Sequence, residues 1–406
     1  MPSPGNEAAS TPAKLECLEA IRGLAASTVV VGHLVLGFWP ALIHRNGPLW
    51  EPVPFWLQTL CRFPGKFLLN GELAVSIFFV LSGFVLSFSY FQRASRAALS
   101  STAIRRYPRL MFPIAASILL AYLLMQTGTM CSQDAVRQMD TGLGLTPDLE
   151  AAPGHSHNWL RAYYGFEPHF ATALSEGVWH ALFTRSTYNL VLWTMPIELV
   201  GSFLVFGFLA LFGSLRNRWI LYATVGVCLL AYDKSYYLDF LLGMALCDGW
   251  VYCQRTQRAA LSLFPALLAI ALGLFAIPWK PLAAVSIVGA TVASPRMQQL
   301  LGARWLRILG QLSFGLYLIH MPVICSLGCG TYLFLARDLA WQHVPASLVA
   351  AAASLLGSVL TAWVFYHVVD RPTISLTRTL DVRLFRPEAP PKGHPAKQAS
   401  ALPRAA

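Results

Sequence analysis

The sequence predicts an all-α membrane protein, a polytopic bundle of about ten transmembrane helices. Of its 406 residues, 56% are hydrophobic and only 12% are charged, whereas soluble proteins carry about 25% charged residues. Several apolar stretches reach the roughly 20 residues that a helix needs to cross a bilayer. The predicted spans are residues 20–40, 71–91, 110–128, 190–212, 219–232, 236–252, 260–277, 282–294, 309–329 and 347–369.

Basic residues gather in every second loop between these spans. The arginines of these loops are Arg93, Arg96, Arg105, Arg106, Arg109, Arg216, Arg218, Arg255, Arg258, Arg296, Arg304 and Arg307. Because Lys and Arg concentrate in cytoplasmic loops, both termini are predicted to be cytosolic, which agrees with an even number of spans. Topology thus explains the net charge of +11, and we expect membrane lipids rather than nucleic acid as partners.

The chain is expected to divide into three regions. Residues 1–14 form a disordered cytosolic N-terminus without the features of a signal peptide, and residues 15–372 form the transmembrane domain. Residues 373–406, rich in Pro, Lys and Ala, form a disordered cytosolic tail. The outer loop of residues 129–189 is expected to form a partly ordered lid, because loops of this length are usually functional or disordered.

None of the eight cysteines forms a Cys-x-x-Cys pair, and most lie in or beside apolar runs. There, cysteine acts as a small apolar residue. Only the outer-loop residues Cys61 and Cys131 could form a disulfide or bind a metal ion. We expect no metal centre and no tightly bound cofactor.

Two ionisable residues, Arg22 and His33, lie in the first predicted span. Such side chains are costly inside a membrane and are candidates for function. They are eleven residues apart, so they project from the same face of a helix, roughly 16 Å apart along its axis. In a purely structural role, the Arg22 side chain would reach the lipid headgroups, and His33 would form a hydrogen bond to a neighbouring helix. Their shared face favours a functional role.

Glu198 and His320 are the next candidates. Glu198 follows Pro196 in the outer half of the fourth predicted span, where the proline frees a backbone carbonyl. It could pair with an arginine of another helix or orient a catalytic histidine. His320 shares one helix face with Ser313 and Tyr317, and it could equally pack there as a hydrogen-bonded core residue.

The basic cluster of Arg105, Arg106 and Arg109 is predicted to lie at the cytosolic mouth of the third span. It could act as a topology signal that binds anionic lipid. It could also hold phosphate, because the arginine fork matches phosphate oxygens. The two roles are compatible.

Six segments resemble, in order, the motifs of the acyltransferase-3 family of membrane acyltransferases, and the resemblance runs from about Leu15 to Pro372. The segments are residues 21–33 with the Arg-x10-His pattern, 72–86, 105–113, 193–198 with Trp-Thr-x-x-x-Glu, 312–322, and 369–372. Two positions depart from the pattern. Ser76 stands where the family usually has an acid, which Glu72 or Glu198 could replace, and the closing acid is Asp370 rather than Glu.

The resemblance implies transfer of an acyl group, often acetyl, from acyl-coenzyme A (acyl-CoA) as co-substrate to a hydroxyl of a glycan or a lipophilic metabolite. We expect the phosphates of coenzyme A (CoA) to dock on Arg22, Arg106 and Arg109, with the pantetheine arm along the first helix. His33 would act as general base, and Glu198 would orient it. The remaining residues of the expected substrate site are Ser82, Tyr317 and His320, with Ser82 or His33 as alternative carriers of the acyl group.

A transporter or flippase without acyl-transfer chemistry is the rival class, because carriers also hold Arg, His and Glu inside the membrane. Carriers often contain two similar halves, and this sequence shows no convincing internal repeat. A non-catalytic sensor is favoured only by the departure at Ser76.

Overall fold

The computed structural model describes residues 11–44, 55–62, 65, 69–93, 96–142, 158–256 and 279–384. Throughout these ranges the regular structure is helical, without strands. Six helical stretches are long and apolar enough to cross a membrane: Glu16–Phe38, Gly71–Gln92, Leu99–Gln126, Leu190–Phe212, Arg304–Asp338 and His343–Thr379. The predicted all-α membrane bundle is therefore confirmed, whereas the number of ten spans is not.

The long helices are α1 (Thr11–Phe38), α5 (Gly71–Arg93), α6 (Arg96–Gln126), α12 (Thr194–Phe212), α14 (Ser235–Arg255), α18 (Arg304–Val323), α20 (His343–Phe365) and α21 (Arg371–Leu384). A 3-10 turn, η2 (Leu190–Trp193), precedes α12. Helix α18 is extended by the π-helical segment η3 (Ile324–Gly328), the helix α19 (Cys329–Leu333) and the π-helical segment η4 (Phe334–Asp338). A further π-helical segment, η5 (Tyr366–Asp370), joins α20 to α21.

The other predicted spans have mixed outcomes. Two match the apolar helices α13 (Arg218–Ala231) and α16 (Lys280–Ala293), which are short for a full crossing. Helix α14 has 21 residues but carries Asp239 and Asp248. The span predicted at residues 260–277 lies outside the described residues. Short helices complete this part of the chain: α2 (Pro40–His44), α3 (Phe55–Arg62), α7 (Ser132–Gly142), α9 (Asn158–Arg161) and α17 (Pro295–Leu301).

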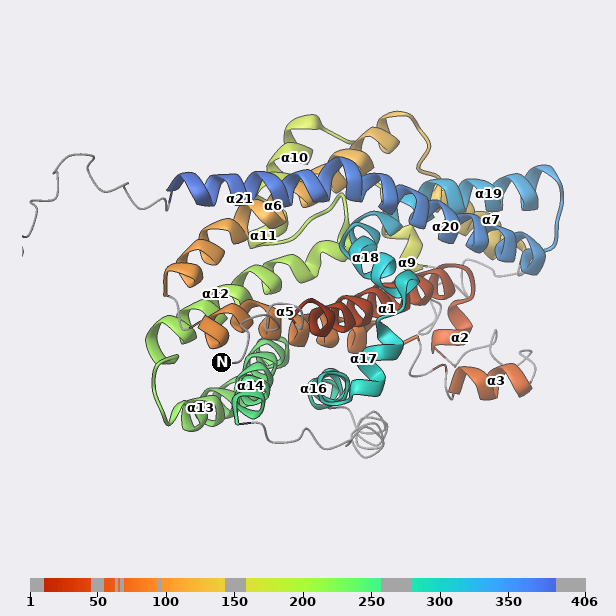
Figure 1. Cartoon of the computed structure of the whole chain (residues 1–406). Coiled ribbons are helices and arrows are strands. Elements are labelled where there is room, and N and C mark those ends of the chain that lie inside the picture. Colours follow the sequence, from red (N-terminus) through yellow and green to blue (C-terminus); the bar gives the residue numbers. More distant parts are fainter. Residues whose placement is uncertain are drawn as a thin grey trace, which may run out of the picture.

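Helix α1 lies inside the bundle, where it packs mainly against α18 and α5 (Figure 1). Helices α5 and α14 approach each other most closely, through Gly83 and Gly243. A Cβ atom at Gly83 would collide with the carbonyl oxygen of Phe240, and one at Gly243 would collide with that of Val80. The two glycines therefore bring the backbones together, as small residues do between membrane helices.

Helix α6 corrects the predicted third span. The helix begins at Arg96 rather than near residue 110, and it contains the whole cluster of Arg105, Arg106 and Arg109. The prediction placed this cluster before the helix because charged residues usually mark the end of a span. The apolar stretch is longer than predicted. Arg106 and Arg109 reach acidic partners on other elements, Glu198 and Asp370.

The outer loop contains a helical segment that packs along α6, formed by α10 (Phe170–Ser175), η1 (Glu176–His180) and α11 (Ala181–Phe183). The Tyr107 hydroxyl donates a 2.5 Å hydrogen bond to the Val178 carbonyl oxygen. The buried Glu176 carboxylate accepts hydrogen bonds from the backbone and side chains of residues 186–188. The predicted lid is thus partly a helix docked on the bundle, while residues 143–157 lie outside the described residues.

Both predicted disordered termini overlap with helices. Helix α1 begins at Thr11, and α21 continues to Leu384 because it packs against α6 and buries Thr373 and Thr377 (Figure 1). The remaining residues of the two tails, 1–10 and 385–406, lie outside the described residues.

Candidate active site

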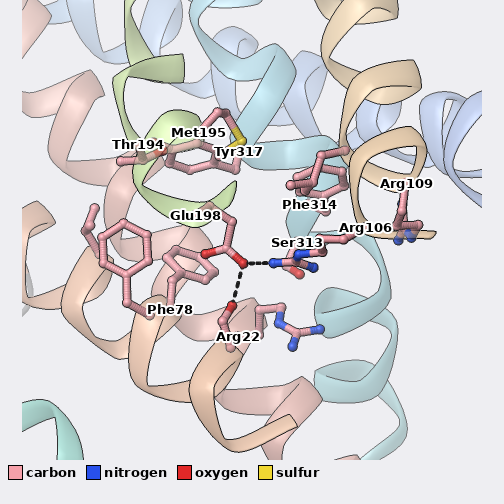
Figure 2. Close-up of a pocket in the computed structure, with 14 residues that line it drawn as sticks. Arg22, Phe78, Arg106, Arg109, Thr194, Met195, Glu198, Ser313, Phe314 and Tyr317 are labelled. Atoms are coloured by element: carbon pink, nitrogen blue, oxygen red, sulfur yellow. Dashed lines mark hydrogen bonds and ion pairs between the residues drawn. The ribbon is translucent and has the colours of Figure 1, made fainter. Parts of the chain in front are cut away.

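A pocket of about 160 Å³ lies between α1, α5, α6, α12 and α18 (Figure 2). Six of the eight residues that the sequence analysis selected line this pocket: Arg22, Ser82, Arg106, Arg109, Glu198 and Tyr317. Aromatic side chains, among them Phe78, Phe79 and Phe314, form the apolar part of its wall. The remaining two selected residues, His33 and His320, lie outside the pocket, beyond Tyr317.

Glu198 is at the centre of the polar part of the pocket. Its carboxylate forms an ion pair with Arg106 and accepts a 2.7 Å hydrogen bond from the Ser82 hydroxyl (Figure 2). Arg106 also donates from Nε to the Ser202 hydroxyl at 2.8 Å. The sequence analysis placed Arg106 and Glu198 at different membrane depths. They meet because Arg106 lies inside α6 rather than before it.

This arrangement gives two of the expected site residues a partner. Glu198 pairs with Arg106, which is one of the two alternatives that the sequence left open. Arg106, expected to bind phosphate, has this carboxylate as its partner inside the protein, and its side chain is only 15% exposed. A buried charge requires such a partner because its desolvation is costly.

The other two arginines of the pocket have different partners. Arg109 donates a 2.5 Å hydrogen bond to Asp370, which is buried, and its guanidinium lies 5.5 Å from the ring centre of Phe314. Arg22 pairs at 3.1 Å with Glu19, one turn earlier on α1, and both side chains are partly exposed. An exposed pair of this kind contributes only about 0–1 kcal/mol. Arg22 is therefore the arginine of the pocket that an anionic ligand can recruit most easily.

His33 and His320 form a direct pair between α1 and α18. His33 Nδ1 lies 2.8 Å from His320 Nε2, and His320 Nδ1 lies 3.1 Å from the Leu316 carbonyl oxygen. A carbonyl only accepts, so His320 Nδ1 carries a proton, and in the neutral ring its Nε2 accepts from His33 Nδ1–H. Among the described residues, His33 Nε2 has no hydrogen-bond partner, so its lone pair is available. This is the state that a general base requires.

Tyr317 lines the pocket and lies one turn before His320 on α18. Its hydroxyl donates a 2.6 Å hydrogen bond to the Val191 carbonyl oxygen and lies 2.8 Å from the Thr194 hydroxyl. Its ring centre is 6.1 Å from that of His320, one turn along α18. The common helix face predicted for Ser313, Tyr317 and His320 thus joins two polar regions of the bundle, since Ser313 lines the pocket.

Among the described residues, four buried acids were not sequence-predicted candidates: Asp140, Glu176, Asp239 and Asp248. Asp248 forms a two-point ion pair with Arg218. Asp239 lies beside Ser76, where the family pattern has an acid, and neither carboxyl oxygen has a hydrogen bond of normal geometry among the described residues. Asp239 and Asp248 lie inside the span predicted at residues 236–252, and a charged residue at such a position is the signal that could have identified them.

No disulfide joins any two cysteines in the described part of the chain. Cys131, one of the two for which a disulfide or metal was open, has its sulfur 3.6 Å from the Ser326 carbonyl oxygen. No group of three His, Cys, Asp or Glu side chains within the described ranges could hold a metal ion.

Comparison with known proteins assigns the class. The profile of the acyltransferase-3 family, described as an acyltransferase domain, matches residues 15–367. The chain therefore belongs to this family and is a membrane acyltransferase, which confirms the family resemblance. The matched range includes five of the six motifs and ends just before the closing one, residues 369–372. This assignment favours an enzyme over the transporter alternative.

Fungal acyltransferases are among the similar proteins. O-acetyltransferase PaAT-1 of Phomopsis amygdali is 24% identical over an alignment of 437 residues, and the alignment covers 92% of this chain and 86% of the relative. Acyltransferase R4 of a Phoma species is 23% identical over 76% of this chain and 80% of its own length. Acyltransferase clz18 of Cochliobolus lunatus is 23% identical, with coverages of 78% and 83%. No solved structure matches the chain.

Proposed function

We propose that this protein transfers an acyl group, acetyl in the first instance, from acyl-CoA to a hydroxyl of a glycan or a lipophilic metabolite. The observation that carries the proposal is the disposition of two groups on α1. Arg22 lines the polar part of the pocket, and His33, three turns further on, has one imidazole nitrogen without a hydrogen-bond partner among the described residues. The name of PaAT-1, an O-acetyltransferase, supports acetyl as the group transferred.

In this proposal the CoA phosphates bind at Arg22, on the side of the bundle predicted to be cytosolic. Arg22 gives up only a weak, partly exposed pair with Glu19, and it then offers a two-pronged contact to phosphate. Arg106 keeps Glu198 as its partner and maintains the pocket wall. The pantetheine arm extends roughly 16 Å along α1, past Tyr317, and places the thioester beside His33.

The acceptor hydroxyl donates its proton to His33 Nε2 as its oxygen attacks the thioester carbonyl carbon. A carbon–oxygen bond forms, and the tetrahedral intermediate collapses with cleavage of the carbon–sulfur bond. The leaving thiolate takes the proton from His33, so the products are an ester and free CoA. His320 orients the ring of His33 and shares the positive charge of the intermediate state, as the second group behind a catalytic base does.

The test is acyl transfer by the purified protein in lipid nanodiscs with labelled acetyl-CoA and a panel of alcohols and glycans. Alanine at His33 should lower kcat by about 10²–10⁴, the usual contribution of a general base. His320→Ala should lower kcat with little change in KM, and His320→Gln should restore part of it, because its amide oxygen can accept from His33 Nδ1–H. Full turnover by His33→Ala would exclude His33 from the chemistry.

A further inference from the structure

An indole ring covers His33 from the side of the long outer loop. The ring centre of Trp159, in α9, lies 5.0 Å from that of His33, and the ring planes are inclined by 39°. His320 also packs on this imidazole, with ring centres 5.1 Å apart. The proposed base therefore contacts both a residue of the bundle and a residue of the outer loop.

Trp159 is held in place through its neighbours. Gly37 follows His33 by one turn of α1, and a Cβ atom there would lie 3.1 Å from Leu160 Cδ1. The glycine thus lets the buried Leu160 pack against α1. Arg161 forms a 2.7 Å ion pair with Asp140 of α7. These contacts fasten α9 to both α1 and α7, so that Trp159 has a defined position over His33.

The geometry of the base brings an acceptor to this indole. His33 Nδ1 is occupied by His320, so the reacting hydroxyl must approach Nε2, at about 3 Å. The indole ring centre is only 5.0 Å from that of the imidazole, so an acceptor bound at Nε2 lies close to Trp159.

The surroundings of Trp159 are apolar and aromatic. The Tyr163 ring is buried and packs edge-on against the indole, with ring centres 5.2 Å apart. Leu160 is buried too, and the nearby charges of Arg161 and Asp140 are paired with each other. The donor side of the site has three arginines, whereas the described residues around Trp159 offer mainly ring faces and aliphatic surface. A sugar would need several polar partners here, and a lipophilic alcohol needs none beyond Nε2.

We infer that Trp159 forms the acceptor-side wall of the reaction site, selects a lipophilic hydroxyl compound over a glycan, and keeps water from the thioester. The inference rests on the proposed function and names its acceptor class. It makes Trp159 a specificity-determining residue.

The experiment compares wild-type protein with Trp159→Ala, Trp159→Phe and Trp179→Ala in nanodiscs. Trp179 is an exposed tryptophan of η1 that packs on Phe183, and it serves as the matched control. Thiol release from acetyl-CoA without an acceptor measures hydrolysis. Transfer is measured to two probes, cyclododecanol and methyl glucoside.

Trp159→Ala should raise hydrolysis severalfold and reduce transfer to cyclododecanol about tenfold or more, the discrimination that one apolar contact supplies. Its KM for acetyl-CoA should stay within about twofold, because only uniform donor binding would change it. Trp159→Phe should retain most of the transfer, and Trp179→Ala should behave as wild type.

Unchanged hydrolysis and unchanged transfer in Trp159→Ala would overturn the inference, as would equal effects of Trp179→Ala. Wild-type protein that acetylates methyl glucoside faster than cyclododecanol, or that acetylates neither, would overturn the acceptor class. The His33→Ala variant separates the two proposals. If it releases thiol like wild type, the proposed function fails; if it is inactive while Trp159→Ala is normal, only this inference fails.

Discussion

The ion pair of Arg106 and Glu198 gives the sharpest test of how this pocket is built. The two side chains are only 15% and 12% exposed. Glu198→Gln removes the negative charge that neutralises the buried Arg106 guanidinium, which keeps its hydrogen bond to the Ser202 hydroxyl. Breaking a buried pair on one side costs about 3–5 kcal/mol, because the other charge stays desolvated. The exposed pair of Arg22 and Glu19 should cost about 0–1 kcal/mol when broken.

The assay is thermal unfolding of the purified protein in detergent, followed by the loss of its monodisperse peak on size exclusion. Glu198→Gln and Arg106→Gln should each lower the transition strongly, and Glu19→Gln should barely move it. The double variant Arg106→Gln/Glu198→Gln should recover most of the loss, since neutral replacement of a whole buried pair is often tolerated.

The double variant also tests whether Arg106 and Glu198 are coupled. If its loss of stability equals the sum of the losses of the two single variants, the pair is not coupled, which would refute this prediction. The double variant also separates stability from catalysis. A stable double variant without activity would return Glu198 to the catalytic role that the sequence analysis considered.

Two further predictions concern the donor and the helix packing. Arg22→Ala should raise the KM for acetyl-CoA and change kcat little in initial-rate kinetics. Arg22→Lys should be intermediate, because lysine keeps the charge but not the two-pronged contact. A constant KM with a lower kcat would contradict docking of the donor at Arg22. Gly243→Ala should destabilise the protein by several kcal/mol, since its Cβ meets the Val80 carbonyl oxygen of α5. Gly207→Ala, with open space around its Cβ, should leave the thermal transition unchanged, and equal effects of both substitutions would refute the packing argument.

The sequence by itself determined the class of protein and most of the candidate site. Low charge and long apolar stretches imply membrane helices, because unpaired backbone groups are too costly in lipid for any irregular span. The spacing of Arg22 and His33 determined that they share a helix face, since the period of an α-helix is constant. Ordered motifs indicated the family that the comparison confirms.

Only the tertiary structure decided which groups meet. That His33 contacts His320, 287 positions later, and that Arg106 pairs with Glu198 follow from how helices pack. No local periodicity encodes this packing. The start of α6 was misplaced for the same reason: charges that look like the end of a span are tolerated inside one when another helix neutralises them. Trp159 was hidden in a long loop, where sequence alone does not determine the position of a ring. The depth of His33 in the bundle and its contacts with His320 and Trp159 therefore depend on long-range packing. The helices that carry these residues depend on the local sequence.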